Sequence, residues 1–394
     1  MSYVFDIIAK EEERQNKTVE LIASENFVSE DVRRAVGSVL TNKYTEGYPA
    51  VRNFGMGRAG RYYGGCQYYD ELEEYCIAQW KKVFKTDYHV NVQPHSGSQA
   101  NMAAYMSVLD LGDTILAMSL DAGGHLTHSS PVSFVSKLYD VVTYGVNDEG
   151  FIDYDEIRRI ALETNPKLIV AGASAYSRKI DFEKFRNIAD DVNGYLMVDM
   201  AHIAGLVAAG EHPSPFGWAD IITTTTHKTI RGPRGGLIFC KHNLANQVDS
   251  AVFPRCQGGS LQHVIAGKAV CAEEACAPEF KEYIKQVKKN CKAMVEEFIS
   301  LGYEIVSGGT DNHLFLLDLR NKGISGLELQ VACDKHDITL NKNSIPNDPR
   351  PPGESSGVRI GTAAMTTKGY TEEDFRAVAR KIDEIVKELQ NEKA

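Results

Sequence analysis

The sequence lacks the cysteine spacing of a metal site or a redox motif. Its eight cysteines include no CxxC pair, and none is combined with histidines at a zinc-finger spacing. We therefore expect reduced thiols in a reducing compartment and predict no metal site. The chain also lacks an apolar run of membrane-spanning length, and residues 1–15 are rich in Glu, Lys and Arg where a signal peptide has an apolar segment. The expected location is the cytoplasm, without a membrane partner.

The sequence also has fewer basic than acidic residues, which gives a formal net charge of −10. Sequence-independent binding of nucleic acid needs clustered Lys and Arg, so we expect no nucleic-acid partner. The hydrophobic content of 43% and charged content of 24% exclude a disordered or fibrous chain. A chain of 394 residues is long enough for two or three domains with substantial cores. Small polar molecules are the expected partners.

Short apolar segments rich in Val and Ile alternate with helical patterns through the middle of the sequence. These segments predict strands over residues 167–171, 195–198, 221–226 and 236–240, and hence βα units with a mostly parallel sheet. After about residue 270 the pattern changes and predicts a second, smaller domain. Its expected elements are an amphipathic helix over 279–300, strands near 313–319, 339–341 and 358–360, and a closing helix over 371–389.

Two polar residues follow predicted strands directly. Lys228 ends the run Thr-Thr-Thr-Thr-His-Lys, where partial burial would lower the pKa of its amine and allow a Schiff base. The alternative is a solvated lysine in a turn. Asp199 ends a second apolar strand, where a carboxylate could pair with a pyridinium nitrogen. The alternative is a helix-capping Asp with His202 as a neighbour.

Other candidate residues lie in loops. Ser96, Gly97 and Ser98 form a hydroxyl-rich turn, predicted to lead into a helix over 102–109, where backbone NH groups suit a phosphate; the alternative is a plain serine N-cap. His125 follows two glycines and could stack on a flat cofactor, although a loop histidine often has no such role. Arg359 lies on a predicted buried strand, so its carboxylate partner is either a substrate or an Asp or Glu of the protein.

One motif is rejected. Residues 55–60 match the dinucleotide-binding pattern GxGxxG, but no Val- and Ile-rich strand precedes them and residues 61–65 do not predict a helix start. We expect a loop there.

The phosphate turn, stacking histidine, pyridine aspartate, Schiff-base lysine and carboxylate-binding arginine together describe a pyridoxal phosphate site. The sequence closely resembles serine hydroxymethyltransferase, a family with the aspartate-aminotransferase-like fold (fold type I), from about Val19 to Thr367. The matching stretches are residues 21–26, 42–49, 93–101, 123–128, 198–202, 223–236 and 310–315. The resemblance implies a three-layer αβα large domain and a smaller α+β C-terminal domain. We divide the chain into an N-terminal arm (1–45), a large domain (46–270) and a small domain (271–394).

The resemblance also implies roles for individual residues. Lys228 would form the Schiff base, with Thr225 and His227 beside it as further catalytic residues. The other cofactor-binding residues would be Ser96, Gly97, Ser98, His125, Ser174, Asp199, His202 and Tyr44, with Gly258 and Gly259 from a second subunit. Arg359 and Ser24 would bind the substrate carboxylate.

The family resemblance further implies an obligate homodimer with shared active sites. Residues matching Tyr44, Glu46 and Tyr63 come from the neighbouring chain, and Glu46 would act as acid and base at the substrate hydroxyl. The implied reaction is the reversible, retro-aldol transfer of a hydroxymethyl group between serine and glycine, with tetrahydrofolate as co-substrate. The folate site would be lined by Tyr62, Leu120, Gly124, Leu126, Phe253 and Asn343.

The sequence departs from the family pattern on the folate-facing and dimer-facing side. Residues 50–60 carry roughly nine extra residues in a segment that the family keeps short. Unusual residues are Arg255, Cys256, Ser260, Gln262, Gly353 and Ala363. An altered loop near a site usually alters function. A folate-independent paralogue therefore remains an alternative: a threonine or β-hydroxy amino acid aldolase, a transaldolase or an α-methylserine hydroxymethyltransferase. A non-catalytic role on the same fold is a second alternative.

Overall fold

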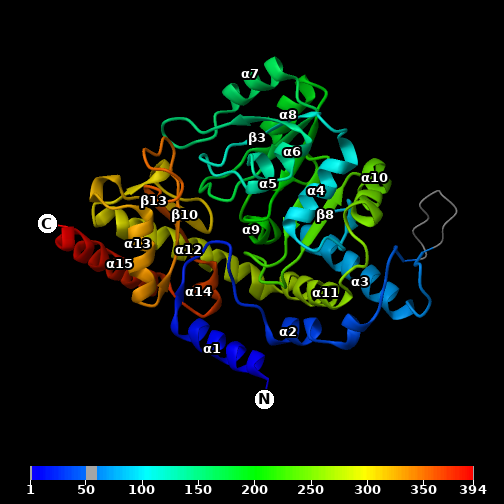
Figure 1. The fold of residues 1–394 in the computed structure, drawn as a ribbon, viewed down its shortest axis with the longest axis horizontal. Coiled ribbons are helices and arrows are strands. Elements are labelled where there is room, and N and C mark those ends of the chain that lie inside the picture. Colours follow the sequence, from blue (N-terminus) through cyan, green and yellow to red (C-terminus); the bar gives the residue numbers. More distant parts are fainter. Residues whose placement is uncertain (1, 50–59, 394) are drawn as a thin grey trace.

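The computed structural model describes residues 2–49 and 60–393, so the predicted loop and insertion at 50–60 lie, except for Gly60, outside the described residues. Figure 1 shows a larger unit around a central sheet and a smaller unit that contains the C-terminus. Within the described residues the central sheet has seven strands in the order β2-β8-β7-β6-β5-β3-β4. Only β8 runs antiparallel to the other six. The prediction of a mostly parallel sheet is confirmed.

The strands of the central sheet, apart from the partly exposed edge strand β4, are largely buried on both faces, as expected for a parallel sheet between helices. They are β2 (His89–Asn91), β3 (Thr114–Met118), β4 (Asp140–Tyr144), β5 (Leu168–Ala171), β6 (Tyr195–Asp199), β7 (Ile221–Thr225) and β8 (Gly236–Cys240). Alternate side chains enter different cores: Leu116 packs into one, and Ile115 into the other.

Helices cover both faces of this sheet, which gives the predicted three-layer αβα architecture. One core receives side chains from α3 (Gln67–Phe84), α7 (Tyr154–Thr164), α8 (Phe182–Asp191), α9 (Ala204–Ala209) and α11 (Gln262–Cys276). The core on the other face receives them from α4 (Gly97–Val108), α6 (Val135–Leu138) and α10 (Ala245–Ser250). The predicted domain boundary near residue 270 falls inside α11 and stays a prediction.

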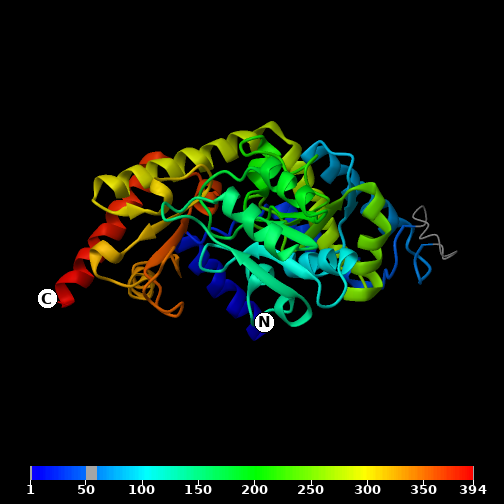
Figure 2. The same cartoon turned by 90° about the horizontal axis from the view of Figure 1, so that it is seen from above.

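The smaller unit is built on an antiparallel sheet with its own core. Its strands, in spatial order, are β12 (Asn341–Asn343), β13 (Gly357–Gly361), β10 (Leu314–Asp318) and β9 (Glu304–Ile305). Its core is completed by α12 (Pro278–Ser300), α13 (Gly326–Lys335) and α15 (Glu372–Lys393). Figure 2 shows α12 extending from the larger unit to the smaller one. The predicted strands near 313–319 and 358–360 and the two long helices are confirmed, with small shifts in their ends.

The prediction of one strand over 339–341 is wrong, because the chain changes partner there. β11 (Ile338–Thr339) pairs in parallel with β1 (Val19–Glu20), whereas β12 pairs with β13. The buried Leu340 lies between the two strands. This exchange ties the N-terminal arm to the smaller unit.

The helix predicted over 102–109 begins earlier, at Gly97. Ser96 is its N-cap, and the Ser96 Oγ accepts a hydrogen bond from the Gln99 amide at 3.2 Å. The remaining short elements are α1 (Tyr3–Lys17), α2 (Glu30–Val36), η1 (Val39–Asn42), α5 (Leu126–Ser129), η2 (His242–Leu244), η3 (Ala251–Cys256), η4 (Val306–Gly308), η5 (Arg320–Lys322) and α14 (Ala363–Thr367). Of all the helices in the described residues, none has both the length and the apolar character needed to cross a bilayer.

Candidate functional site

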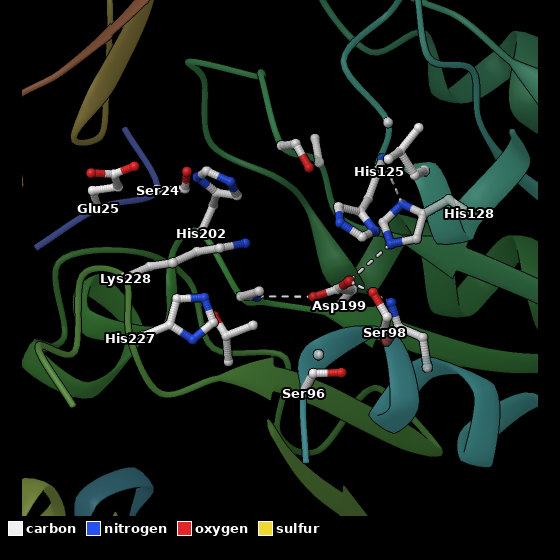
Figure 3. Close-up of a pocket in the computed structure, with 18 of the residues that line it drawn as sticks. Ser24, Glu25, Ser96, Ser98, His125, His128, Asp199, His202, His227 and Lys228 are labelled. Atoms are coloured by element: carbon white, nitrogen blue, oxygen red, sulfur yellow. Dashed lines mark hydrogen bonds and ion pairs between the residues drawn. The ribbon is translucent and has the colours of Figure 1, made fainter. Parts of the chain in front are cut away.

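A cavity of about 470 Å³ lies at the carboxyl ends of the central strands, where ligands bind in open α/β sheets. Figure 3 shows Lys228, Asp199 and His125 around this space. Most of the predicted site residues line it: Ser24, Ser96, Gly97, Ser98, Leu120, Gly124, His125, Leu126, Ser174, Asp199, His202, Thr225, His227, Lys228 and Arg359. Predicted site residues from seven stretches of the chain thus meet in one cavity.

The serine turn, residues 95–98, lies at the N-terminus of α4. Gly97 is needed there, because a Cβ on it would lie 2.6 Å from the Thr225 Cγ2. The free amides of the first helical turn and the hydroxyls of Ser96 and Ser98 point to an anion site. The turn has the chemistry to hold a phosphate group.

Lys228 follows β7 and is 8% exposed. Burial lowers the pKa of its amine to about 8, against the attraction of Asp199, and the positive charges of Arg359 and Arg234 act in the same direction as burial. The backbone at Lys228 is held by the N-terminal arm, because the Asn26 Nδ2 donates a hydrogen bond to the Lys228 carbonyl at 3.0 Å. A buried amine with a lowered pKa suits Schiff-base formation.

Asp199 ends β6 in a network of donors. Its Oδ2 accepts from the His128 Nε2 and from the Asn101 Nδ2, both at 2.9 Å, and its Oδ1 accepts from the Ala201 amide at 3.0 Å. Burial alone would raise the pKa of this carboxyl, but the hydrogen bond and charge of His128 outweigh burial and hold the pKa well below its usual range. Asp199 is therefore a fixed carboxylate, as pairing with a protonated ring nitrogen requires.

Burial lowers the pKa of three of the histidines that line the cavity, which favours their neutral form. Burial lowers the pKa of His125 to about 4, of His227 to about 3 and of His202 well below its usual value. His125 is the N-cap of α5, and its Nδ1 lies 2.8 Å from the Thr127 Oγ1. Neutral imidazoles can lie against a planar ring or exchange hydrogen bonds with its oxygens without adding charge.

Arg359 reaches the cavity from β13 of the smaller unit. Its Nη1 donates to the Ser174 carbonyl at 2.7 Å, and its Nη2 lies 3.3 Å from the Asn341 Oδ1. Among residues 2–49 and 60–393, no carboxylate forms a salt bridge with this guanidinium, whose pKa burial lowers to about 10. The sequence left two candidate partners for Arg359, a substrate carboxylate or an Asp or Glu of the protein. The described residues provide no Asp or Glu partner, which favours the substrate.

Several buried polar atoms around the cavity have no hydrogen-bond partner within the described part of the chain. They include the Thr225 Oγ1, the His227 Nδ1 and the Arg359 Nε. Unpaired buried polar atoms are rare in folded proteins because each one costs about 1–3 kcal/mol. Their gathering at one cavity fits a bound polar molecule with an anionic end, as pyridoxal phosphate and an amino acid would provide together.

The remaining predicted residues do not line this cavity. Tyr44 and Tyr63 are exposed, with ring centroids 5.7 Å apart, and Glu46 and Tyr44 lie beside Gly258 and Gly259 respectively. Tyr62 contacts Phe253 edge to face at 6.3 Å. Asn343 lies on β12, where its Nδ2 donates to the Ser344 carbonyl at 2.7 Å. We name Tyr44, Glu46, Tyr62, Tyr63, Phe253, Gly258 and Gly259 the outer cluster.

Sequence reasoning missed the residues that support Asp199. The Asn101 Nδ2 also donates to the Thr127 Oγ1 at 2.8 Å, and the Thr223 Oγ1 donates to the Asn101 Oδ1 at 2.6 Å. The only available signal was spacing: Asn101 lies one helical turn after Ser98, and His128 three residues after His125. Arg234, which lines the cavity next to Lys228, was also missed.

His125, His128 and Asp199 have donor atoms within 4.8 Å of one another, which is the composition of a metal site. However, His128 and Asp199 are already bonded to each other. This arrangement is accounted for by the carboxylate network, and we assign no metal to it.

A buried lysine and a fixed carboxylate at adjacent strand ends, together with a helix N-terminus for an anion, define a pyridoxal phosphate enzyme of the aspartate-aminotransferase-like fold. The sequence model of the serine hydroxymethyltransferase family matches residues 2–382, nearly the whole chain. The chain therefore belongs to the serine hydroxymethyltransferase family, whose members are pyridoxal-phosphate-dependent transferases, and the resemblance noted in its sequence is confirmed.

Proposed function

We propose that this chain transfers a hydroxymethyl group reversibly between serine and glycine, with pyridoxal phosphate as cofactor and tetrahydrofolate as the one-carbon acceptor and donor. The observation that carries the proposal is the pairing of two buried cationic groups in one cavity. Lys228 has the lowered pKa of a Schiff-base lysine, and Arg359 has no carboxylate partner among the residues that the structure describes. One group suits an aldehyde, and the other suits the carboxylate of an amino acid.

The cofactor would be held at four points. The serine turn would bind the phosphate, Asp199 would keep a proton on the ring nitrogen, and His125 would lie against the ring. Ser174 and His202 would contact the phenolic oxygen. When bound, pyridoxal phosphate supplies a conjugated ring that delocalises the electron pair left on Cα when the Cα–Cβ bond breaks.

The substrate would be oriented from the smaller unit. Arg359 and Ser24 would hold its carboxylate, so that the bond to be broken lies at a fixed angle to the ring plane. Lys228 would be free to take and return protons, because a pKa of about 8 leaves part of its amines neutral at physiological pH. Thr225 and His227 flank Lys228 and have the unpaired polar atoms noted above.

The acid and base at the substrate hydroxyl would come from a second copy of the chain. Glu46 is the proposed group, yet it lies in the outer cluster rather than among the residues lining the cavity. We therefore propose a homodimer in which the outer cluster of one subunit completes the cavity of the other. Tyr44 and Tyr63 would enter the site in the same way, with Gly258 and Gly259 beside the phosphate.

Three of the predicted folate residues lie at the cavity. Leu120, Gly124 and Leu126 line the cavity, and Leu120 and Leu126 are exposed leucines at its edge. Such an apolar edge suits a flat aromatic ring. Tyr62 and Phe253 belong to the outer cluster and would reach a shared folate from the second subunit, whereas Asn343 lies on β12, next to the strand that carries Arg359.

A spectral titration tests the proposal in three steps. The purified protein with pyridoxal phosphate should absorb in the visible range, and borohydride reduction followed by mass spectrometry should locate the cofactor on Lys228. Glycine with tetrahydrofolate should then raise a long-wavelength band that glycine alone raises weakly. A colourless protein would support a non-catalytic role. A cofactor-bearing protein without any folate response would support a folate-independent paralogue.

A further inference from the structure

Lys268 is a buried cation directly behind the serine turn, and the proposed function does not use it. It lies on α11 and is 1% exposed. Its Nζ donates to the carbonyls of Val92 at 2.7 Å, Pro94 at 3.0 Å and Gly236 at 2.9 Å. An ammonium group has three donors, so the backbone uses all of them.

The charge of Lys268 has no ion-pair partner: in the described part of the chain no carboxylate forms a salt bridge with it. Burial lowers the pKa of this amine to about 8, against the attraction of Cys76 and Glu73. A buried cation without a counter-ion is costly in a folded protein. The three carbonyls offset part of that cost, and an anion bound nearby would offset more of it.

The three acceptor carbonyls belong to segments that adjoin the serine turn and the loop of Lys228. Pro94 leads into the serine turn, and the Gly236 amide donates to the Pro94 carbonyl at 3.1 Å. The Gly235 carbonyl accepts from the Thr226 amide at 3.1 Å, two residues before Lys228. Lys268 thus joins the serine turn to the strand ends that carry the reactive lysine.

The space around this ammonium is shaped by glycine. A Cβ on Gly235 would lie 2.4 Å from the Lys268 Cε and 3.1 Å from its Nζ, and a Cβ on Gly236 would lie 2.4 Å from the Ser96 carbonyl oxygen. The charge also acts on the turn, since the pKa of His95 is lowered by burial and further by Lys268. A fixed positive charge is therefore placed behind an anion site.

We infer that Lys268 is a positioning residue for the phosphate of the cofactor: its three hydrogen bonds fix the serine turn, and its charge makes the turn selective for an anionic group. The inference rests on the proposed function, because it takes pyridoxal phosphate as the ligand. It predicts that Lys268 affects only ligands with a phosphate. If the loss of Lys268 merely destabilised the fold as a whole, binding of phosphorylated and unphosphorylated ligands would weaken alike.

The test compares pyridoxal phosphate with pyridoxal, which has the same aldehyde and ring but no phosphate. Dissociation constants for both are measured by absorbance titration of the apo form of the parent, Lys268→Met and Gly235→Ala. Lys285→Met, which removes an exposed lysine on α12, is the control. We expect Lys268→Met to weaken pyridoxal phosphate binding by about tenfold to a hundredfold, because it removes both the charge behind the serine turn and the hydrogen bonds that fix the turn, and pyridoxal binding by less than about twofold.

Gly235→Ala keeps the ammonium but displaces it, so we expect a smaller loss in the same direction. This variant decides the question if Lys268→Met does not fold. An equal loss for both ligands, or none, in a folded variant overturns the inference and leaves the proposed function intact. A parent that binds neither ligand overturns the proposed function, and this inference with it.

Discussion

His128 and Asp199 form a buried hydrogen bond in which the His128 Nε2 lies 2.9 Å from the Asp199 Oδ2. The side chain of His128 is 1% exposed, so this bond is shielded from water and from salt. It is the largest single influence that lowers the pKa of Asp199 against the cost of burial. The ionised state of Asp199 therefore depends on a residue that need not touch a ligand.

We expect His128→Ala to weaken cofactor binding by about tenfold to a hundredfold, because a charge-assisted hydrogen bond contributes about 1.5–3 kcal/mol. The remaining carboxylate would be more easily protonated, and the visible band of the bound cofactor would shift with pH in a range where the parent is constant. Absorbance titration between pH 5 and 8 measures both effects. His336→Ala removes a partly exposed histidine of the smaller unit and should change neither. A pH-independent spectrum in His128→Ala would contradict this account of Asp199.

Arg359→Met should separate substrate binding from folding. Since no acid of the described chain pairs with this guanidinium, its removal leaves no carboxylate unpaired, and the melting temperature of the apo protein should stay the same or rise. The dissociation constants of glycine and serine should rise by about tenfold to several hundredfold, because a bidentate charged contact is lost. Thermal unfolding measures the melting temperature, and spectral titration measures the dissociation constants of glycine and serine. An apo protein that loses several degrees of stability would instead show that the hydrogen bonds from Arg359 to the Ser174 carbonyl and the Asn341 side chain outweigh the cost of its buried charge.

The pKa of Lys228 sets the pH dependence of cofactor capture. Only the neutral amine attacks an aldehyde, and burial lowers the pKa to about 8, so the neutral form predominates above that pH and is lost below it. We expect the second-order rate of capture to be about a tenth of its plateau at pH 7 and about half of it at pH 8, and to approach the plateau near about pH 9.

Stopped-flow absorbance of apo protein mixed with pyridoxal phosphate provides the measurement. Pyridoxine phosphate has an alcohol in place of the aldehyde, so its binding rate should stay nearly constant between pH 7 and 9. A rate that still climbs at pH 10 would mean that Lys228 has the pKa of a solvated lysine.

The sequence allowed the central sheet and two key residues of the cavity to be predicted for the same physical reason, whereas most of the other cavity residues were predicted from the family resemblance. Fully buried parallel strands have short, continuous apolar sequences. A polar residue just after such a sequence lies at the edge of the sheet where the carboxyl ends of the strands meet. Lys228 and Asp199 were found in this way. The partners of Asp199 could not be found, because Asn101 and His128 reach it from separate elements that only the tertiary fold brings together.

The departures from the family pattern are partly explained by contacts that sequence alone does not reveal. The Ser260 Oγ lies 2.8 Å from the Thr45 Oγ1, and the Gln262 Nε2 donates to the Glu73 Oε2 at 3.1 Å. Glu73 in turn forms a buried ion pair with Arg61 at 2.7 Å. Arg61 also donates to the carbonyls of Thr45 and Gly47, on either side of Glu46. Ser260 and Gln262 thus support the chain around Glu46, and their identities do not themselves argue against folate.

The outer cluster offers a test of the proposed shared site that needs no structure of a dimer. Glu46→Gln should lower turnover by about a hundredfold or more, as expected for loss of a general acid and base. Lys228→Ala should abolish it. If Glu46 acts in the cavity of the other subunit, then unfolding and refolding the two inactive variants together creates mixed dimers with one complete site.

An equal mixture should regain about a quarter of the parent activity, because half of the dimers are mixed and each has one of its two sites intact. Mixing Lys228→Ala with Arg359→Met is the matched control. Both residues line the same cavity of one chain, so mixed dimers should contain no complete site and no activity should return. If activity returns in the control mixture as well, or in neither mixture, Glu46 does not act in a site shared between subunits. The outer cluster would then not be part of the active site.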